Sequence, residues 1–471
     1  MKTRKNISIL LVLLLGVLLN FSPVHAKDTA KLKKRHISSE DVSSILAKYK
    51  IRPEQVSIQI IDDVGEILSL NSSIKKSPAS LSKLITTFAV LKRLPLGHKF
   101  YTRLYRDSKN LYLQGGGDPA FVSENLWYMV NELTRSGLKT VQGNIIVDDS
   151  LFDKIRFDES RHDKRVDRAY DSPVGAMSFN WNAVNIFVKP GVLGEKAHVT
   201  ADPDSDYFSI VNNTMTVAGT SKTELKISIS NSEKLITVSG EVIVGEKEKL
   251  IYKSIDEPDL WSGTNLVSFM EQRDIITSGY VVAGRVPDKA ELLVTLESKS
   301  LSAILADMNK YSNNFVAEML TKAMAVQEQK SGATLKRGVE MINEELVKIG
   351  ISRDEILIVN PSGLTSNNLI SAASLNRVLS HIKKDFSIYP TFLEGLPIAG
   401  IDGTLKKRMK GSLAEGWVRA KTGTLTGAVS LAGYAGRRDG QVLTFSFLYN
   451  GPQSETNIRE AFDQLIINSL K

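Results

Sequence analysis

The chain of 471 residues contains no cysteine. This absence excludes disulfide bonds, a thiolate nucleophile, cysteine-ligated metal and the cysteine-linked lipid of lipoproteins. Histidine is also scarce, and none of the six histidines has the H-E-x-x-H spacing of zinc peptidases. No serine stands in the G-x-S-x-G turn of the α/β-hydrolases. We therefore expect neither of these chemistries, and nothing in the sequence calls for a metal or an organic cofactor.

The chain also lacks internal repeats, low-complexity tracts and an apolar run long enough for a comfortable membrane span. Its N-terminal apolar run, Ile7–Leu19, follows the basic segment Lys2–Lys5, and Val24–Ala26 resembles a small-residue cleavage site. We expect residues 1–26 to be a secretory signal peptide, with an uncleaved anchor as the alternative. The mature protein would then be secreted across the inner membrane, reside in the periplasm and have no stable membrane span.

The chain also lacks a large net charge of either sign. The formal net charge is +8, and it falls to +5 without residues 1–26, which contain three basic and no acidic residues. Dispersed charge of this size suits loose association with an anionic envelope polymer and does not indicate a nucleic-acid site. Two basic blocks have no interleaved aromatic residues. We interpret Lys31–Arg35 as a solvated segment and Lys406–Lys410 as an exposed helix face.

Three short motifs, far apart in the chain, carry the chemical signal. They are Ser80-Leu81-Ser82-Lys83, Ser312-Asn313-Asn314 and Lys421-Thr422-Gly423-Thr424. Together they offer a serine nucleophile, a lysine to take its proton, a second hydroxyl with an amide, and a cationic strand edge suited to a carboxylate. This set of groups is typical of acyl transfer. Each pattern is short enough to recur by chance, so its sequence context decides.

The context of Ser80 predicts the start of a buried helix. Pro78 precedes an apolar pattern with helical spacing that runs from Leu81 to Leu91. Residues three apart on a helix lie on one face, so Lys83 can approach the Ser80 hydroxyl. The alternative is an ordinary N-terminal helix serine with an exposed lysine.

The second motif falls between two helical patterns, Leu301–Met308 and Phe315–Ala323. This position predicts that Ser312 and Asn314 lie in a tight loop. A loop held between packed helices can keep a hydroxyl and an amide still, although serine and asparagine are also common helix caps.

The third motif has the pattern of a strand. It is followed by the apolar runs Val429–Ala435 and Val442–Tyr449, which predicts an antiparallel meander. Glycine weakens a strand, so Gly423 is expected to leave room for a ligand backbone to approach this edge.

In this order the motifs resemble those of the penicillin-binding proteins, the serine D-alanyl-D-alanine peptidases. The chain resembles specifically the D-alanyl-D-alanine carboxypeptidase/endopeptidase family, class C of the low-molecular-mass group. Ser80 and Ser312 are separated by 232 positions, more than one such domain places there, so an insertion is implied. Further stretches that match the family pattern are Gly115–Pro119, Val147–Phe152, Ser172–Val174, Ser362–Leu364 and Gly400–Leu405.

The resemblance implies an α/β (α+β) fold. A penicillin-binding-protein/β-lactamase-like transpeptidase domain would carry two nested accessory domains between the first and second motifs. We expect a catalytic domain of residues 27–95 and 292–471, accessory domain II of residues 96–192 and 255–291, and a nested β-rich accessory domain III of residues 193–254. The catalytic sheet should join residues 56–70 to the three C-terminal strands.

The resemblance also implies the roles of the first-motif residues. Ser80 would attack the carbonyl of the penultimate D-alanine and form an acyl-enzyme. Lys83 would be its base, because burial and a second cation such as Lys421 both favour a neutral amine. The backbone N–H groups of Ser80 and Thr424 would form the oxyanion hole.

For the other two motifs the resemblance implies contacts with the substrate. Ser312 would relay a proton to the departing amine, and Asn314 would hold the substrate peptide amide. Lys421, Thr422, Gly423 and Thr424 would form the edge that binds the terminal carboxylate.

Two accessory positions follow from the same resemblance. Asp148 is the candidate partner for the free amine of the peptide cross-linking residue, with Asp149 and a plain turn aspartate as alternatives. Asn360 stands where the family pattern leads us to expect an aspartate. This departure weakens the case that its loop supports the site.

The sequence therefore predicts a serine-type D-alanyl-D-alanine carboxypeptidase or endopeptidase. Its partners would be peptidoglycan peptides as substrates and β-lactam antibiotics as covalent inhibitors. The alternatives are a β-lactamase, which would need an additional base for deacylation, and a non-catalytic peptidoglycan-binding protein of the same fold. The sequence makes no prediction of the oligomeric state.

Overall fold

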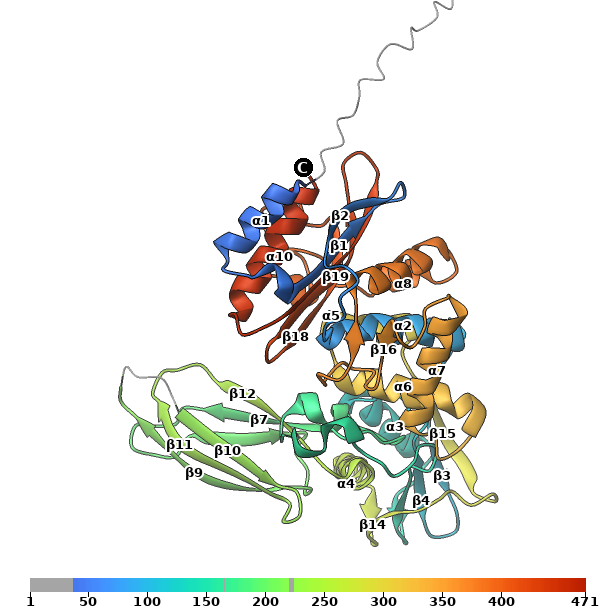
Figure 1. The fold of residues 1–471 in the computed structure, drawn as a ribbon. Coiled ribbons are helices and arrows are strands. Elements are labelled where there is room, and N and C mark those ends of the chain that lie inside the picture. The colour runs from blue at the N-terminus through green and yellow to red at the C-terminus, as the bar shows by residue number, and fades with distance from the viewer. Residues whose placement is uncertain (1–36, 165, 220–223) are drawn as a thin grey trace, which may run out of the picture. The chain divides into compact units, whose positions relative to one another are not determined.

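The computed structural model describes residues 37–164, 166–219 and 224–471 (Figure 1). The predicted signal peptide and the basic block Lys31–Arg35 lie outside these residues. The described α-helices are α1 (Ser39–Lys48), α2 (Ser82–Arg93), α3 (Ser123–Arg135), α4 (Pro258–Glu271), α5 (Leu301–Lys310), α6 (Asn314–Gln329), α7 (Leu335–Lys348), α8 (Ala372–Lys384), α9 (Tyr389–Glu394) and α10 (Glu455–Ser469). The 3₁₀ turns are η1 (Pro53–Gln55), η2 (Ala79–Leu81), η3 (Glu159–Lys164), η4 (Ala169–Asp171), η5 (Asn180–Asn182) and η6 (Gly403–Leu405).

One five-stranded antiparallel sheet joins the two ends of the described chain. Its strand order is β18 (Val418–Leu425), β19 (Ala428–Gly436), β20 (Val442–Asn450), β1 (Val56–Ile61) and β2 (Glu66–Leu70). The N-terminal hairpin pairs with the last strand of the C-terminal meander, with Ile58 opposite Phe447. The predicted catalytic sheet is therefore confirmed, including the meeting of segments that are distant in sequence.

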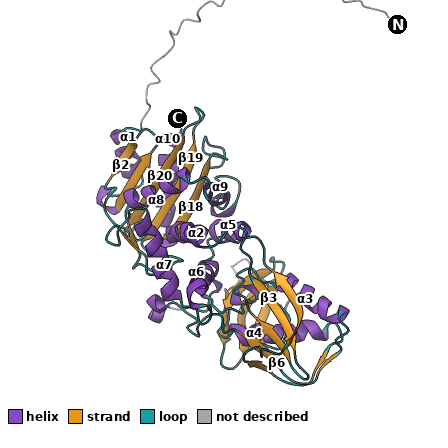
Figure 2. Cartoon of the chain, turned by 90° about the vertical axis from the view of Figure 1, so that its right-hand side faces the viewer, coloured by secondary structure: helices purple, strands orange, loops and turns teal. Residues whose placement is uncertain are grey.

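Helices cover both faces of this sheet because its strands alternate between two cores. On β19, Leu431 packs with α1 and α10 on one face, whereas Tyr434 faces the core built around α2, α6 and α8 (Figures 1 and 2). Phe447 and Phe462 pack against each other in the first core, with ring centroids 5.5 Å apart and ring planes inclined by 50°. Burying such a side chain fully stabilises the fold by about 1.5–3 kcal/mol.

The insertion between the first two motifs forms further sheets. A mixed sheet has the order β14 (Val281–Ala283), β6 (Ile145–Asp148), β4 (Leu111–Gln114), β3 (Tyr101–Arg106) and β15 (Glu291–Glu297). Two three-stranded sheets follow the orders β12 (Lys249–Ser254), β7 (Ala183–Lys189), β8 (His198–Asp202) and β10 (Glu224–Ser230), β11 (Leu235–Ile243), β9 (Ser209–Val217). A short two-stranded pair in the insertion is formed by β5 (Thr140–Val141) with β13 (Ile276–Thr277). A second short pair, formed by β16 (Ile356–Leu357) with β17 (Leu369–Ile370), lies beyond the second motif.

The strand pairings suggest different boundaries between the proposed domains from those expected. β15 pairs with β3 of the mixed sheet, and β7 pairs with β8 and β12. On this basis we propose that the catalytic domain resumes after Glu297 rather than at residue 292, and that β7 belongs to accessory domain III. In the described part of the chain, none of the helices combines the length and the apolar character that a membrane crossing requires.

Candidate active site

The predicted nucleophile lies in a tightly fixed turn. Ser80 is the central residue of η2, which runs directly into α2. Ala79 has a φ of +50°, in the left-handed region that alanine rarely adopts. The Ser430 hydroxyl of β19 donates to the Pro78 carbonyl at 2.7 Å, and the Ser82 hydroxyl donates to the Ala79 carbonyl at 3.0 Å. The surroundings thus hold the turn in a conformation that costs free energy, as is common at functional sites.

Lys83 is buried because α2 is buried all round, not only along the predicted apolar face. The polar Thr86 and Thr87 of this helix are also buried, and their hydroxyls donate to the carbonyls of Pro361 and Lys83. The ammonium position of Lys83 is therefore shielded from water and surrounded by protein groups.

Among the described residues, the acceptors that Lys83 contacts are all neutral. Its Nζ donates to Ser80 Oγ at 3.2 Å, to Asn314 Oδ1 at 2.6 Å and to the Ser362 carbonyl at 2.5 Å. Burial first, and then the charge of Lys421, lower the pKa of Lys83 well below its ordinary value. A lysine that loses its proton this readily beside a serine hydroxyl can act as a base.

The second and third motifs meet where Lys421 contacts Ser312. Ser312 lies in the turn between α5 and α6, with a φ of +56°. Lys421 on β18 donates from Nζ to Ser312 Oγ at 2.8 Å and to the Thr422 carbonyl at 2.7 Å. Burial lowers the pKa of Lys421 to about 7. The three remote motifs therefore converge, as expected.

Asn314 differs from the sequence expectation in its position and its contacts. It is the first residue of α6 rather than part of the loop, and Asn313 caps the helix by accepting from the Val316 N–H. The Asn314 amide accepts from Lys83 and donates to the Tyr170 carbonyl at 3.0 Å. Both ends of this side chain are thus engaged within the protein.

Gly423 also has a different neighbourhood from the one expected. A Cβ atom at this position would lie 2.2 Å from Ser430 Oγ, 2.7 Å from the Pro78 carbonyl oxygen and 3.0 Å from the Ser80 nitrogen. The space beside the glycine is therefore filled by the turn that carries Ser80. The glycine allows β18 to pack closely against that turn, and a ligand backbone has no room on this side.

A cavity of about 650 Å³ opens at this convergence. Its lining combines the motif residues Ser80, Ser312, Thr422 and Thr424 with Thr404, Lys407, Arg408, Met409, Thr456, Arg459, Glu460 and Asp463. The expectation that Lys406–Lys410 forms an exposed helix face is wrong. This block follows η6 as turns outside any α-helix, and three of its residues reach the cavity wall.

Glu318 was not predicted from the sequence, although it lies close behind Lys83. It follows Asn314 by four positions and therefore shares its face of α6. Glu318 Oε1 accepts from Ser362 Oγ at 3.1 Å, and the Ser362 carbonyl accepts from Lys83. Burial first, and then the nearby carboxylate of Asp158, raise the pKa of Glu318 to about 7.

Asn360 supports this loop in spite of its departure from the family pattern. Its Oδ1 accepts from the backbone N–H groups of Ser362, Gly363 and Leu364 at 2.9, 2.7 and 3.2 Å. Its Nδ2 donates to Asp158 Oδ2 at 2.6 Å. An aspartate could accept the three N–H groups but would face the carboxylate of Asp158 without a proton to donate, so asparagine suits this setting.

Asp148 and Asp149 both have partners within the accessory part. Asp148 accepts from the N–H groups of Ser150 and Val286, both at 3.0 Å, and the cavity beside Ser80 does not include it in its lining. Asp149 pairs with Arg156 and accepts from the Met177 N–H at 2.5 Å. Recognition of a cross-linking residue by Asp148 stays a prediction.

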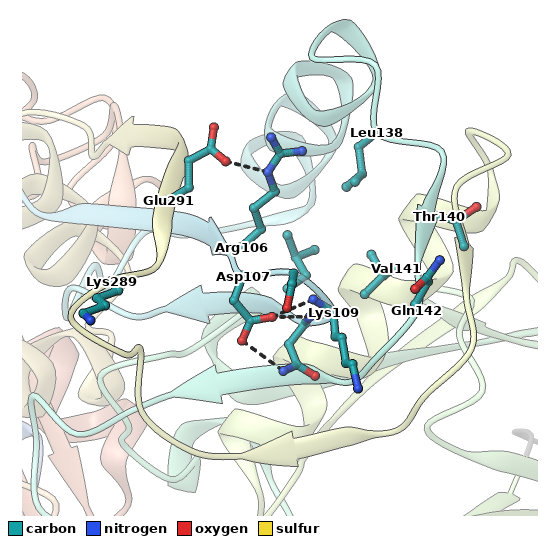
Figure 3. Close-up of a pocket in the computed structure, with 12 residues that line it drawn as sticks. Arg106, Asp107, Lys109, Leu138, Thr140, Val141, Gln142, Lys289 and Glu291 are labelled. Atoms are coloured by element: carbon teal, nitrogen blue, oxygen red, sulfur yellow. Dashed lines mark hydrogen bonds and ion pairs between the residues drawn. The ribbon is translucent and has the colours of Figure 1, made fainter.

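A second cavity, of about 580 Å³, lies beside the mixed sheet (Figure 3). Three of its charged groups have partners: Arg106 donates to Glu291 at 2.8 Å, and Asp107 accepts from the N–H groups of Lys109 and Asn110. These hydrogen bonds, with the Asn110 N–H as the largest contribution, lower the pKa of Asp107 below its usual range. Ser80, which contacts the buried Lys83, lines the cavity of about 650 Å³ and not this one, so the cavity at Ser80 is the candidate active site.

The antiparallel sheet, the helix that carries the serine and lysine, and the inserted sheets together define the penicillin-binding-protein class of fold. A crystal structure of penicillin binding protein 4 (dacB) from Haemophilus influenzae has this fold, with a TM-score of 0.77 at 23% identity over 90% of this chain and 98% of that one. A second structure of that protein, in complex with a β-lactam, has a TM-score of 0.74 at 22% identity over 92% of this chain and 99% of that one.

The sequence comparison then identifies the family. The chain belongs to the D-Ala-D-Ala carboxypeptidase 3 (S13) family, whose model matches residues 38–469. It is 30% identical over 436 residues to the D-alanyl-D-alanine carboxypeptidase of Actinomadura sp. (strain R39), covering 88% of this chain and 80% of that protein. It is 26% identical over 410 residues to the carboxypeptidase DacB of Haemophilus influenzae, covering 82% of each. The protein is thus a D-Ala-D-Ala carboxypeptidase of the penicillin-binding-protein type.

Proposed function

We propose that this carboxypeptidase is a serine enzyme that cleaves the terminal D-Ala-D-Ala bond of peptidoglycan stem peptides through an acyl-enzyme on Ser80. The observation that carries the proposal is the contact between Ser80 Oγ and Lys83 Nζ, in a setting that favours the neutral amine. The mature enzyme is expected to work outside the inner membrane, where its polymeric substrate lies.

In the acylation step Lys83 Nζ takes the proton of Ser80 Oγ, and the oxygen attacks the carbonyl carbon of the penultimate D-alanine. The backbone N–H groups of Ser80 and Thr424 receive the developing oxyanion, and one such donor contributes about 3–4 kcal/mol in the transition state. Asn314 holds Lys83 in position through its Oδ1.

The tetrahedral intermediate collapses when the C–N bond breaks and the leaving amine takes a proton. Ser312 passes that proton from Lys421, and the hydrogen bond that its hydroxyl accepts from Lys421 Nζ supports this role. The proton that Lys83 took from Ser80 replaces the one that Lys421 gave up, which returns Lys83 to the neutral amine. A water molecule then attacks the ester carbonyl, Lys83 takes the water proton and gives it to Ser80 Oγ, and Ser80 leaves as the free hydroxyl when the ester C–O bond breaks. Peptide and D-alanine are the products.

The proposal extends to cross-linked peptides and to β-lactams. Endopeptidase activity would use the same attack, with the amine of a cross-linking residue as the leaving group, and Asp148 is the proposed partner of its free amine. A β-lactam ring would acylate Ser80 in the same way. The β-lactam complex of the Haemophilus influenzae protein supports this part of the proposal.

The decisive experiment is covalent labelling of the purified mature protein with a fluorescent penicillin, followed by peptide mapping. We expect the label on Ser80 and release of D-alanine from a pentapeptide. Ser80→Ala should abolish both, whereas Ser73→Ala, at an exposed serine with the same S-x-x-K spacing, should abolish neither. Labelling that persists in Ser80→Ala would refute the assignment of the nucleophile.

Three other results would redirect the proposal. Rapid turnover of a chromogenic cephalosporin without release of D-alanine would indicate a β-lactamase. Absence of both labelling and hydrolysis would indicate a binding protein. Mass spectrometry of digested peptidoglycan fragments would measure how terminal D-alanine removal compares with cleavage of cross-links.

A further inference from the structure

The carboxylate of the leaving residue needs a charged partner, and Lys421 is poorly suited to that task. Lys421 is fully buried, and it is not among the residues that line the cavity at Ser80. Its Nζ is engaged by Ser312 Oγ and the Thr422 carbonyl, and burial lowers its pKa to about 7. Near neutral pH it is therefore not a permanent cation.

A permanent cation lies beside β18 in the lining of the cavity. Arg459, on the first turns of α10, lines the same cavity as Ser80 and Ser312. Its Nη2 donates to Thr424 Oγ1 at 3.1 Å and to Glu455 Oε2 at 2.9 Å, and 41% of its side chain is exposed. Arginine stays protonated at all physiological pH values and its planar fork matches a carboxylate.

The contact with Thr424 orients a second donor. Because Thr424 Oγ1 accepts from Arg459, its own proton is left to donate to a ligand. Thr422, two positions earlier on the same face of β18, donates its proton to Thr404 Oγ1 at 2.9 Å. Arg459 and Thr424 therefore offer an anion both a positive charge and a free hydroxyl proton, whereas Thr422 has already donated its proton within the protein.

The other charged groups of the wall do not offer the same combination. Arg408 is held by both carboxylate oxygens of Asp463 at 3.2 and 2.6 Å. Lys407 also lines the cavity, and Glu460 there is an acid. Neither Lys407 nor Arg408 has a hydrogen bond to a β18 hydroxyl in the described structure.

We propose that the Arg459 guanidinium, together with the Thr424 hydroxyl, binds the α-carboxylate of the residue that leaves as the free amine. This inference rests on the proposed function and names the substrate class that the site prefers. Substrates would be peptides whose leaving residue has a free carboxylate, whether a terminal D-alanine or a cross-linking diamino acid. Amidation of that carboxylate would protect a peptide from cleavage.

The test compares two peptides that differ only in this group. One ends in D-Ala-D-Ala and the other in D-Ala-D-alaninamide, and kcat/KM is measured for both with the full mature protein. We expect wild type to prefer the acid. A hydrogen bond to a charged group is worth about 1.5–3 kcal/mol, so Arg459→Gln should lower kcat/KM for the acid by about 10- to 100-fold and leave the amide almost unchanged.

Two further variants test whether the preference for the acid depends on the guanidinium of Arg459 and not on positive charge in general. Arg459→Lys should restore part of the preference, because it returns the charge without the planar fork. Lys406→Gln removes one positive charge from an exposed residue outside the cavity lining and should leave the acid-to-amide ratio at the wild-type value.

Several outcomes would overturn the inference. They are an unchanged ratio in Arg459→Gln, an equal loss for both peptides, which would make Arg459 only a support for Thr424, or the same loss of preference in Lys406→Gln. In each case wild type would still release D-alanine, so the proposed function would stand. A wild-type protein that neither takes label on Ser80 nor releases D-alanine would refute both.

Discussion

Two buried lysines of this protein lie in contrasting surroundings. Lys83 on α2 contacts a serine hydroxyl, an amide oxygen and a peptide carbonyl, all of them neutral. Lys322 on α6 is almost as buried, but its Nζ contacts the Asp153 carboxylate at 2.5 Å and the Ile155 carbonyl at 2.7 Å.

The difference between them lies in the charge of the partner. Burial lowers the pKa of both lysines, but the hydrogen bond and charge of Asp153 oppose that change at Lys322. At Lys83 the second largest effect is the positive charge of Lys421, which lowers the pKa further. Lys322 is therefore built to remain an ammonium that ties α6 to the accessory segment, whereas Lys83 is built to lose its proton.

The contrast is sharpest when each lysine is replaced by a side chain of similar length. Lys83→Met should remove the base, and general base catalysis contributes about 10²- to 10⁴-fold to rate. We expect acylation by a fluorescent penicillin to slow by this factor while the circular dichroism spectrum and Tm stay close to wild type. A loss of less than tenfold would mean that another group takes the serine proton.

Lys322→Met should instead affect stability. It leaves the Asp153 carboxylate, whose side chain is 17% exposed, without its cation, and breaking a buried pair in this way costs about 3–5 kcal/mol. Denaturant unfolding should show this loss, and the acylation rate of the folded fraction should not change. Adding Asp153→Asn should recover most of the stability, because the unpaired charge is then gone. If it does not, the pair is not what holds the two segments together.

Giving Lys83 a carboxylate partner should make it hold its proton as Lys322 does. Asn314→Asp would put a carboxylate against Lys83, which favours the ammonium and raises the pKa of Lys83. The base form exists only above this pKa, so the acid limb of the pH–rate profile for acylation should move to higher pH. Asn313→Asp adds the same charge at the helix cap without touching Lys83 and should shift the limb much less. Equal profiles for both variants would contradict the argument.

The sequence predicted the parts of the site that local pattern determines. The strand at Lys421, the turn at Ser312 and the helix after Pro78 each follow from spacing and turn chemistry, and the sheet pairs the segments as expected. The motif residues could be named for the same reason, since each motif is contiguous.

What the sequence did not reveal depends on packing between distant segments. The reason for Gly423 is the close approach of Ser430 and the Ser80 turn, which no local pattern encodes. The contact between Arg459 and Thr424 exists only because the fold brings α10 to β18. Glu318 could have been suspected from its spacing of four from Asn314, but its link to Lys83 runs through Ser362 in a remote loop.

Glu318 gives the smallest and most specific prediction, because it reaches Lys83 only through that loop. Its carboxylate attracts the Lys83 ammonium, so Glu318→Gln should lower the pKa of Lys83 and move the acid limb of acylation to lower pH, opposite to Asn314→Asp. The pKa of Glu318 is raised to about 7, so the charge exists only above that value. The two acylation profiles, measured by stopped flow, should therefore coincide well below pH 7 and separate above it, by less than about one unit along the pH axis. A constant offset at every pH would instead mean that the substitution disturbs the Ser362 loop, and the link between the two buried groups would be structural rather than electrostatic.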